Sequence, residues 1–212
     1  MNDGERQLQD RLGTRERADA FHARQTLRHL NDAMRDFIGR QEMMFLATAD
    51  ASGDCDSTFR AGPPGFVRVL DEQHLTWPEY RGNGVMASLG NITENAHVGL
   101  LFIDFREAIG LHVNGTAEIV EDPDEQADTP PGQRARLWVV ARVQEAYIHC
   151  AKRIPRLAKI PRQPARHEAG PAKKSDYFVA GPPRPLPIAG QPCRPGLPRD
   201  PSSTSVASES AA

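Results

Sequence analysis

The chain has 212 residues, a length that suits one domain with terminal extensions. It contains 26 Lys and Arg residues against 28 Asp and Glu residues, a formal net charge of -2, so no strong positive field draws it to nucleic acid or anionic lipid. No apolar run approaches the roughly 18 to 20 residues of a membrane span, and the N-terminus lacks the apolar region of a secretory signal. We therefore expect a cytoplasmic protein that binds neither nucleic acid nor membranes.

Apolar residues of the N-terminal segment recur at three- and four-residue intervals, which is typical of one helix face. This spacing predicts a single helix over residues 14–40, with Thr14 as its cap. We assign residues 1–42 to an N-terminal helical extension. The apolar positions are Leu27, Leu30, Met34, Phe37 and Ile38.

From residue 43 the pattern changes to short strands bounded by Gly, Pro and Asp. Residues 43–61 form a hairpin signal, and residues 109–120 alternate apolar odd positions with polar even ones. Six or seven short antiparallel strands with one inserted helix fit a closed or partly closed barrel, because closure removes exposed sheet edges. We assign residues 43–160 to this mainly β domain. Further strands are expected at 66–70, 75–80, 97–104 and 137–143, and the helix at 85–95.

Proline is concentrated near the C-terminus, where 12 of the 18 prolines lie from Pro155 onward. Residues 181–212 have almost no aliphatic periodicity and cannot bury enough apolar area to offset the entropy of ordering. We expect residues 161–212 to form a Pro-rich, largely disordered tail.

The stretch "WPEYRGNGVMASLGN" runs from a strand through a small loop into a helix. Gly82 and Gly84 let the backbone come close to a ligand, the first helical N–H groups are unpaired, and Arg81 offers a planar fork for phosphate. Ser88 adds a hydroxyl group. This pattern predicts an anion site, although an ordinary strand-to-helix connection is the competing interpretation.

Two further arginines, Arg60 and Arg68, lie in neighbouring strand-like segments, and Arg60 shares a strand face with Thr58 and Asp56. An arginine in a barrel strand is costly unless it is paired. Each side chain therefore points into solvent or meets an anion or acid in a pocket.

Other chemistry is less well supported. The three cysteines have no C-x-x-C spacing, which argues against a disulfide framework or a zinc site. His149 and Cys150 are adjacent, so a strand would turn them to opposite faces. His97 and His112 stand alone and are expected to be strand histidines rather than catalytic bases. We assign no catalytic residue and no metal ligand.

Several stretches together resemble the pyridoxamine 5'-phosphate oxidase-like proteins, the FMN-binding split-barrel superfamily. The resemblance runs over about residues 13–160. It rests on "GPPGFVRVLDE", "RGN", "SLGNITENAHVGLLF", "HVNGTAEIVED" and "YIHCAK".

The resemblance implies a six-stranded antiparallel split barrel that forms a homodimer with FMN between the subunits. It implies that basic and hydroxyl groups around the loop hold the flavin phosphate, while strand backbone lies along the ring. It also implies a small-molecule redox substrate, with NAD(P)H as an electron donor to be tested. By position, the implied FMN-binding residues are Arg60, Phe66, Val67, Arg68, Val69, Tyr80, Arg81, Gly82, Asn83 and Ser88.

The sequence also departs from authentic pyridoxamine phosphate oxidases. It lacks their Ser-Arg-Lys run after the loop and their C-terminal Trp and Arg signature, so vitamin B6 oxidation is not implied. We expect an FMN-dependent oxidoreductase of unknown substrate. The alternatives left open are an F420- or haem-binding split barrel, a flavin-binding module without turnover, and a structural barrel without a ligand.

Overall fold

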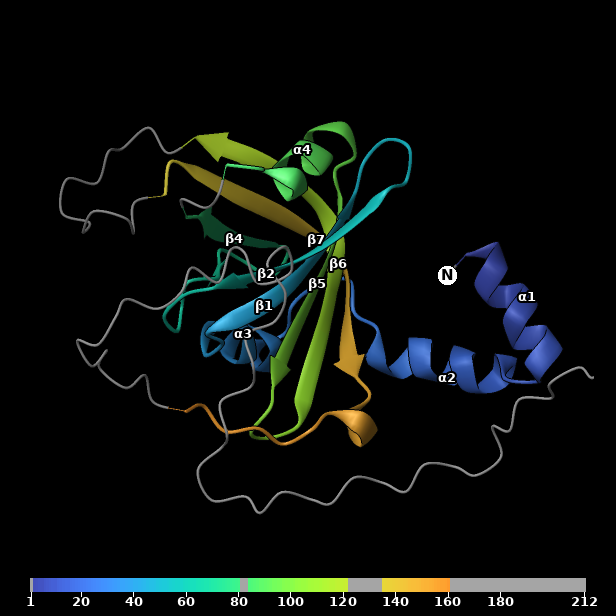
Figure 1. The fold of residues 1–212 in the computed structure, drawn as a ribbon. Coiled ribbons are helices and arrows are strands. Elements are labelled where there is room, and N and C mark those ends of the chain that lie inside the picture. The colour runs from blue at the N-terminus through green and yellow to red at the C-terminus, as the bar shows by residue number, and fades with distance from the viewer. Residues whose placement is uncertain (1, 81–83, 122–134, 161–212) are drawn as a thin grey trace, which may run out of the picture. The chain divides into compact units, whose positions relative to one another are not determined.

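The computed structural model describes residues 2–80, 84–121 and 135–160. In this part of the chain one antiparallel sheet curls into a split barrel, with the strand order β2-β1-β5-β6-β7-β4-β3 (Figure 1). The strands are β1 (Met43–Ala49), β2 (Cys55–Ala61), β3 (Arg68–Val69), β4 (His74–Glu79), β5 (His97–Asp104), β6 (Ile109–Glu121) and β7 (Leu137–His149).

The core lies on the inner face of this curled sheet and follows the period of two along each strand. In β6, Leu111, Val113 and Ala117 are buried, as their odd positions predict, while His112 and Asn114 lie half-buried on the other face. Ile109, at the first odd position, is instead 43% exposed because it lies at the strand end. The alternating pattern of residues 109–120 is thus confirmed apart from this end.

The sheet has seven strands, where the family resemblance implied six, and one of the seven, β3, is short. The segment 66–70 was expected to be one strand, but only Arg68 and Val69 pair with β4. Phe66 and Val67 turn into the core and are 5% and 1% exposed. Phe66 packs so closely on Gly62 that a Cβ added there would lie 2.5 Å from the Phe66 Cβ.

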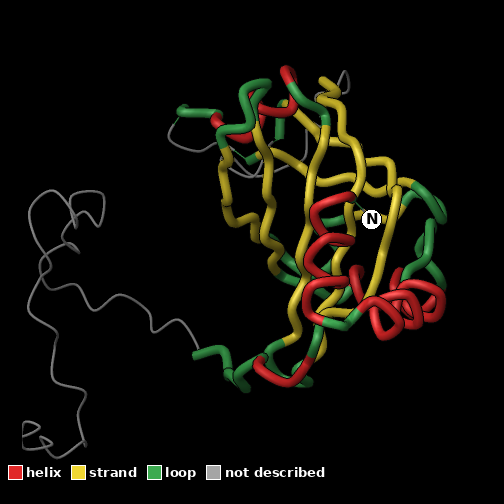
Figure 2. Tube along the Cα trace, turned by 90° about the vertical axis from the view of Figure 1, so that its right-hand side faces the viewer, coloured by secondary structure: helices red, strands yellow, loops and turns green. Residues whose placement is uncertain are grey.

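The N-terminal segment forms three helices rather than the single helix expected over residues 14–40. They are α1 (Asp3–Leu12), α2 (Arg15–Gln25) and α3 (Asp32–Gly39). Thr14 does occupy the N-cap position of α2, although its side chain makes no capping hydrogen bond. Neither α1 nor α2 contains a buried residue, and α2 leads away from the sheet (Figures 1 and 2).

The helix is interrupted between α2 and α3 because the backbone there forms hydrogen bonds with distant parts of the chain. Leu27 forms an isolated antiparallel bridge with Ala146, and the Leu30 N–H donates to the Glu72 carbonyl over 2.7 Å. Asn31 then restarts the helix by accepting a hydrogen bond from the Met34 N–H. Apolar residues recur at the helical spacing on both sides of this break, so their periodicity alone predicted one helix.

The helix between β4 and β5 is α4 (Ala87–Glu94). Leu89 and Ile92 are buried, as the predicted apolar face requires, whereas Val85 precedes the helix and is 71% exposed. No helix in the described ranges is long and apolar enough to cross a bilayer. The expected tail, residues 161–212, lies outside the described residues.

Candidate functional site

The connection between β4 and α4 is tied to β2 on its β4 side by an ion pair. Arg60 on β2 donates from Nε to both carboxylate oxygens of Glu79, the last residue of β4, over 2.8 and 3.1 Å. The two side chains are only 20% and 11% exposed. The Trp77 indole also donates to Glu79 over 3.0 Å. The end of β4 is therefore held at a fixed place beside β2.

The α4 side of the connection is tied to the same face of β2. Ser88, which is 4% exposed, donates from Oγ to Oδ2 of Asp56 over 2.8 Å. Asp56, Thr58 and Arg60 share that face, and Arg60 also donates to Thr58 over 3.0 Å. One row of β2 thus anchors the chain before and after the loop.

The loop itself contains Arg81, Gly82 and Asn83, which lie outside the described residues. Gly84, directly after them, has φ +85°, a left-handed conformation that suits glycine. Met86 also has a positive φ of 54° at the N-cap of α4. The chain therefore turns sharply twice before the helix, as the predicted small loop requires.

Arg60 and Ser88, which the sequence proposed as phosphate ligands, both face carboxylates. Of the two alternatives for Arg60, solvent or a partner in a pocket, the structure supports the second, and the partner is an acid. A guanidinium beside a carboxylate has little net charge left to attract a phosphate. Both residues instead hold the described chain on either side of the loop, at Glu79 and Ser88, beside β2.

Arg68 is also a cation of the site, and among the described residues it has no carboxylate partner. It is exposed, and its guanidinium carbon lies 4.8 Å from the centre of the Trp138 ring, a cation–π geometry. Trp138 is paired with Pro78 near the end of β4. Arg68 therefore provides positive charge near the strand end from which the loop starts.

The outer edge of β3 offers backbone groups next to Arg68. Leu70 donates its N–H to the His74 carbonyl, and Arg68 pairs with Thr76. Hydrogen bonds alternate along an antiparallel pair, so the N–H and C=O of Val69 point away from β4. Of the segment expected to lie along a ring, Val69 is thus placed on an edge, while the side chains of Phe66 and Val67 belong to the core.

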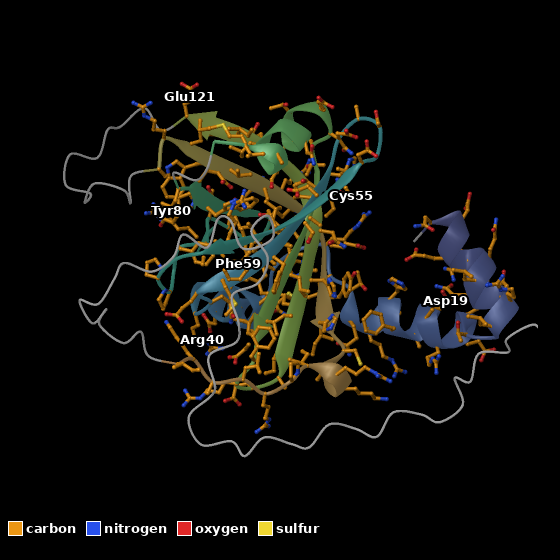
Figure 3. All side chains as sticks on the ribbon, viewed as in Figure 1. Asp19, Arg40, Cys55, Phe59, Tyr80 and Glu121 are labelled. Carbon is orange, nitrogen blue, oxygen red and sulfur yellow. The ribbon has the colours of Figure 1, made fainter. Side chains whose placement is uncertain are left out.

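Exposed apolar side chains flank the loop on both sides. Tyr80 is 37% exposed at the end of β4 (Figure 3), and Val85 and Met86 are 71% and 61% exposed before α4. Three large apolar groups beside one short loop form a surface on which a flat apolar ligand could lie.

A second polar cluster, which the sequence did not reveal, lies on the outer face of β6 and β7. His112 Nε2 is 2.8 Å from His149 Nδ1, and the His112 ring stacks on Tyr147 with a centroid distance of 4.8 Å. Burial lowers the pKa of His112, the charge of His149 lowers it further, and Glu145 opposes this. Burial also raises the pKa of Tyr147. The expectation that His112 stands alone is therefore wrong, since strand register brings together residues 37 apart in sequence.

The described residues contain no group of three or more His, Cys, Asp or Glu side chains that could hold a metal ion. Cys55 and Cys150 are both exposed with free thiols, while Cys193 lies outside the described residues.

Comparison with known proteins identifies the family. A family model described as pyridoxamine 5'-phosphate oxidase matches residues 30–150, which include the barrel strands and the whole loop between β4 and α4. The chain belongs to the pyridoxamine 5'-phosphate oxidase family. A comparison with curated proteins gives no match.

Solved structures similar to this family member include three bacterial proteins. A candidate pyridoxamine 5'-phosphate oxidase from Lactobacillus delbrueckii is 25% identical, with a TM-score of 0.43 and coverage of 58% of this chain and 98% of that chain. HupZ from Group A Streptococcus is 24% identical, with a TM-score of 0.42 and coverage of 56% and 92%. HutZ, a haem storage protein from Vibrio cholerae, is 16% identical, with a TM-score of 0.40 and coverage of 56% and 94%.

Proposed function

We propose that this member of the pyridoxamine 5'-phosphate oxidase family is an FMN-binding oxidoreductase that works as a cytoplasmic homodimer on a small-molecule redox substrate. The observation that carries the proposal is the loop between β4 and α4, which is fixed to β2 at both ends by Arg60–Glu79 and Ser88–Asp56. A loop whose ends are held by such contacts is suited to present backbone N–H groups to an anion without reorganisation.

The residues around this loop fit FMN, which has a phosphate dianion and a flat ring system. Arg68 is a cation without a carboxylate partner among the described residues, and Arg81 adds a second guanidinium in the loop sequence. Tyr80, Val85 and Met86 provide exposed apolar surface. The Val69 N–H on the sheet edge is a donor for a ring acceptor.

The division of roles follows from these contacts. Arg68, Arg81, Gly82 and Asn83 would hold the phosphate, while Arg60 and Ser88 would position the loop. When bound, FMN would supply hydride or electron transfer. The chain would supply binding and orientation, and a donor such as the Val69 N–H would favour the reduced, more negative ring. No side chain of the site need act as a general acid.

The first test is the visible spectrum and the released cofactor of the purified protein. A yellow protein that releases FMN, or an apoprotein that takes up FMN at a 1:1 ratio to protomer, supports the proposal. A Soret band would indicate haem, and uptake of F420 without uptake of FMN would indicate deazaflavin. Either of these results contradicts FMN as the cofactor.

A second measurement separates turnover from storage. The FMN-loaded protein is mixed anaerobically with NADH or NADPH, and bleaching of the flavin absorbance is followed, then its return with a panel of acceptors. Bleaching and reoxidation faster than those of free FMN support an oxidoreductase. Rates equal to those of free FMN support a flavin-binding module.

A further inference from the structure

Charge is distributed unevenly along the chain, although the whole sequence is nearly neutral. Residues 1–150 contain 15 Lys and Arg against 24 Asp and Glu, whereas residues 151–212 contain 11 against 4. Most of this C-terminal excess lies in residues 151–174, which contain eight Lys and Arg and one acid, Glu168. The expectation that the protein binds neither nucleic acid nor membranes rested on the total charge, in which this basic segment is cancelled by the acidic rest of the chain.

The basic segment begins with a three-residue repeat. Residues 153–161, "RIPRLAKIP", are three successive triplets of a basic residue, an aliphatic residue, and Pro or Ala. Pro155 and Pro161 disfavour helix in the residues before them, and Ile154 is extended with φ -74° and ψ 116°. An extended chain with three residues per turn places the basic side chains of such a repeat along one side and the aliphatic ones along another. We call residues 153–160 the basic strap.

The basic strap is attached to the barrel at two points. It begins at the end of the short 3₁₀ helix η1 (Ala151–Arg153) and continues without helix or strand. The Leu157 N–H donates to the Phe105 carbonyl over 3.1 Å, in the turn between β5 and β6. Lys159 Nζ donates to both carboxylate oxygens of Glu42, just before β1, over 2.7 and 2.8 Å. These contacts hold the strap along one end of the sheet (Figure 1).

The side chains of the strap are mostly exposed to solvent. Leu157 and Ile160 are 57% and 86% exposed. Lys152, Arg153 and Arg156 are exposed as well, and none of the three has a carboxylate partner among the described residues. Aliphatic groups gathered on a surface in this way are typical of an interaction site. Here they alternate with cations whose charge is available to a partner.

The combination of basic and aliphatic side chains favours an anionic lipid surface as that partner. Lys and Arg are attracted to the negative headgroups, while aliphatic side chains enter the boundary between headgroups and acyl chains. Single-stranded nucleic acid is usually bound with aromatic side chains on which the bases stack. Residues 151–174 contain no Phe, Tyr or Trp, so the segment lacks that feature.

The strap lies at the opposite end of the sheet from α4. Glu42, to which the strap is paired, precedes β1, whereas α4 contacts the chain that follows β1: its Glu94 accepts a hydrogen bond from the Ala51 N–H over 3.3 Å. Figure 1 shows α4 and the strap at the two ends of the sheet. A surface bound to the strap would therefore leave the loop between β4 and α4 open to a small molecule.

We propose that the basic strap docks this protein reversibly on an anionic lipid surface. Lys152, Arg153 and Arg156 lie against the headgroup phosphates, and Leu157 and Ile160 enter the headgroup boundary. The acidic excess of the remaining chain faces away, because a negative surface repels it. Docking on lipid is separate from the proposed function and does not require that FMN be the cofactor.

The test uses the full-length protein and vesicles of two compositions. Vesicles of phosphatidylcholine alone are compared with vesicles of equal parts phosphatidylcholine and phosphatidylglycerol, and the bound fraction is measured by cosedimentation over a lipid series. We expect binding to the mixed vesicles only, weakening as salt is added because the attraction of exposed charges is screened. A wild-type protein that does not bind the mixed vesicles would overturn the proposal.

The double variant Arg153→Gln with Arg156→Gln tests the basic side of the strap. It should bind the mixed vesicles about 25-fold more weakly, since each Lys or Arg near such a surface contributes about five-fold. Arg153→Lys with Arg156→Lys, which keeps both charges, should bind like the wild type. The matched control is Arg24→Gln with Arg28→Gln, two exposed arginines near the C-terminal end of α2. Equal losses in the strap variant and this control would mean that total charge, not the strap, binds the lipid.

The double variant Leu157→Ala with Ile160→Ala tests the aliphatic side and distinguishes lipid from nucleic acid. It keeps every charge, and because both side chains are exposed it should keep the wild-type circular dichroism spectrum. We expect it to bind the mixed vesicles about 10-fold or more weakly, because the removed methyl and methylene groups no longer enter the membrane boundary. The matched control is Leu8→Ala with Leu12→Ala on α1, where the side chains are 48% and 67% exposed, and it should bind like the wild type.

An unchanged affinity of the Leu157→Ala, Ile160→Ala variant for the mixed vesicles would overturn the proposal. So would a single-stranded oligonucleotide that displaces the wild-type protein from the vesicles and binds this variant with the same affinity. That result would assign the strap to nucleic acid.

Discussion

Arg60 on β2 and Glu79 on β4 form an ion pair between the two ends of the curled sheet, with Nε 2.8 Å from Oε1. β2 is the terminal strand at one end of the strand order, and β4 is next to the terminal strand at the other. β2 and β4 are not neighbours in the sheet, so this side-chain contact links two strands that the backbone hydrogen bonds do not join. The same contact holds the start of the candidate phosphate loop.

Glu79→Gln should destabilise the fold by roughly 1–3 kcal/mol, because it keeps the shape and an acceptor for Trp77 but leaves Arg60 without its counter-charge in a mostly buried place. Urea unfolding followed by circular dichroism measures this. The control is Glu42→Gln, whose pair with Lys159 has side chains 41% and 77% exposed and should contribute less than about 1 kcal/mol. Equal effects of the two substitutions would contradict a structural role for the Arg60–Glu79 pair.

Arg68→Ala should weaken FMN binding by roughly 1–3 kcal/mol, or about 5- to 150-fold, as expected for a charge-assisted contact. Its side chain is exposed and outside the core, so the free energy of unfolding should hardly change. Isothermal titration of apoprotein with FMN measures the affinity. Arg106→Ala, an exposed arginine in the turn after β5, is the control.

Arg81→Ala should weaken FMN binding about as much as Arg68→Ala does, because Arg81 would contribute its guanidinium from the loop itself. Unchanged affinity in this variant would remove Arg81 from the phosphate site, and unchanged affinity in both variants would contradict the placement of the phosphate here.

The sequence predicted the barrel strands well where alternation was regular. The 43–61 hairpin and the strand at 97–104 are confirmed, and β6 has the predicted inner face. Alternation could not show where tertiary contacts override a local period. Leu27 and Leu30 continue a helical spacing, but their backbones are hydrogen-bonded to Ala146 and Glu72 outside any helix. Phe66 and Val67 have the apolar side chains of a strand, but these side chains enter the core ahead of the short β3.

The sequence predicted where the candidate site lies, but not which side chains pair with each other around it. A strand, a Gly-containing loop and a helix start predicted where a ligand could bind. The carboxylates opposite Arg60 and Ser88 come from β4 and β2, and only three-dimensional pairing brings Glu79 and Asp56 to them. His112 and His149 likewise meet through strand register, which no local motif records.

Gly115→Ala should destabilise the protein by roughly 1–3 kcal/mol, because a Cβ there would lie 2.0 Å from the Arg142 carbonyl oxygen and the backbone would have to shift. Gly90→Ala is the matched change in α4, where nothing lies within 4 Å of the added Cβ, and it should stabilise by about 0.5–1 kcal/mol. Thermal and urea unfolding measure both. The register of β6 and β7 shifts between Asn114 and Gly115. A destabilised Gly90→Ala together with a neutral Gly115→Ala would contradict the close approach of the two strands at this shift.

Deletion of residues 181–212 should leave the fold and the FMN content unchanged. The family match ends at residue 150, before this segment begins. The thermal midpoint and the flavin-to-protein ratio of the shortened chain are the measurements. A loss of either would show that the deleted residues contact the domain.

Stability should fall as the pH drops below about 6.5, and His112 should contribute to the decrease. Burial and the neighbouring His149 lower the pKa of His112 in the folded protein. In the unfolded chain its pKa returns to about 6.5, so below that pH the unfolded state binds more protons and the free energy of unfolding decreases.

His112→Gln should therefore show a shallower loss of stability between pH 7.5 and pH 5, measured by urea unfolding at one protein concentration. His29→Gln, at an exposed position between α2 and α3, should keep the wild-type slope. If His112→Gln kept the wild-type slope as well, the protonation of His112 would not be linked to folding.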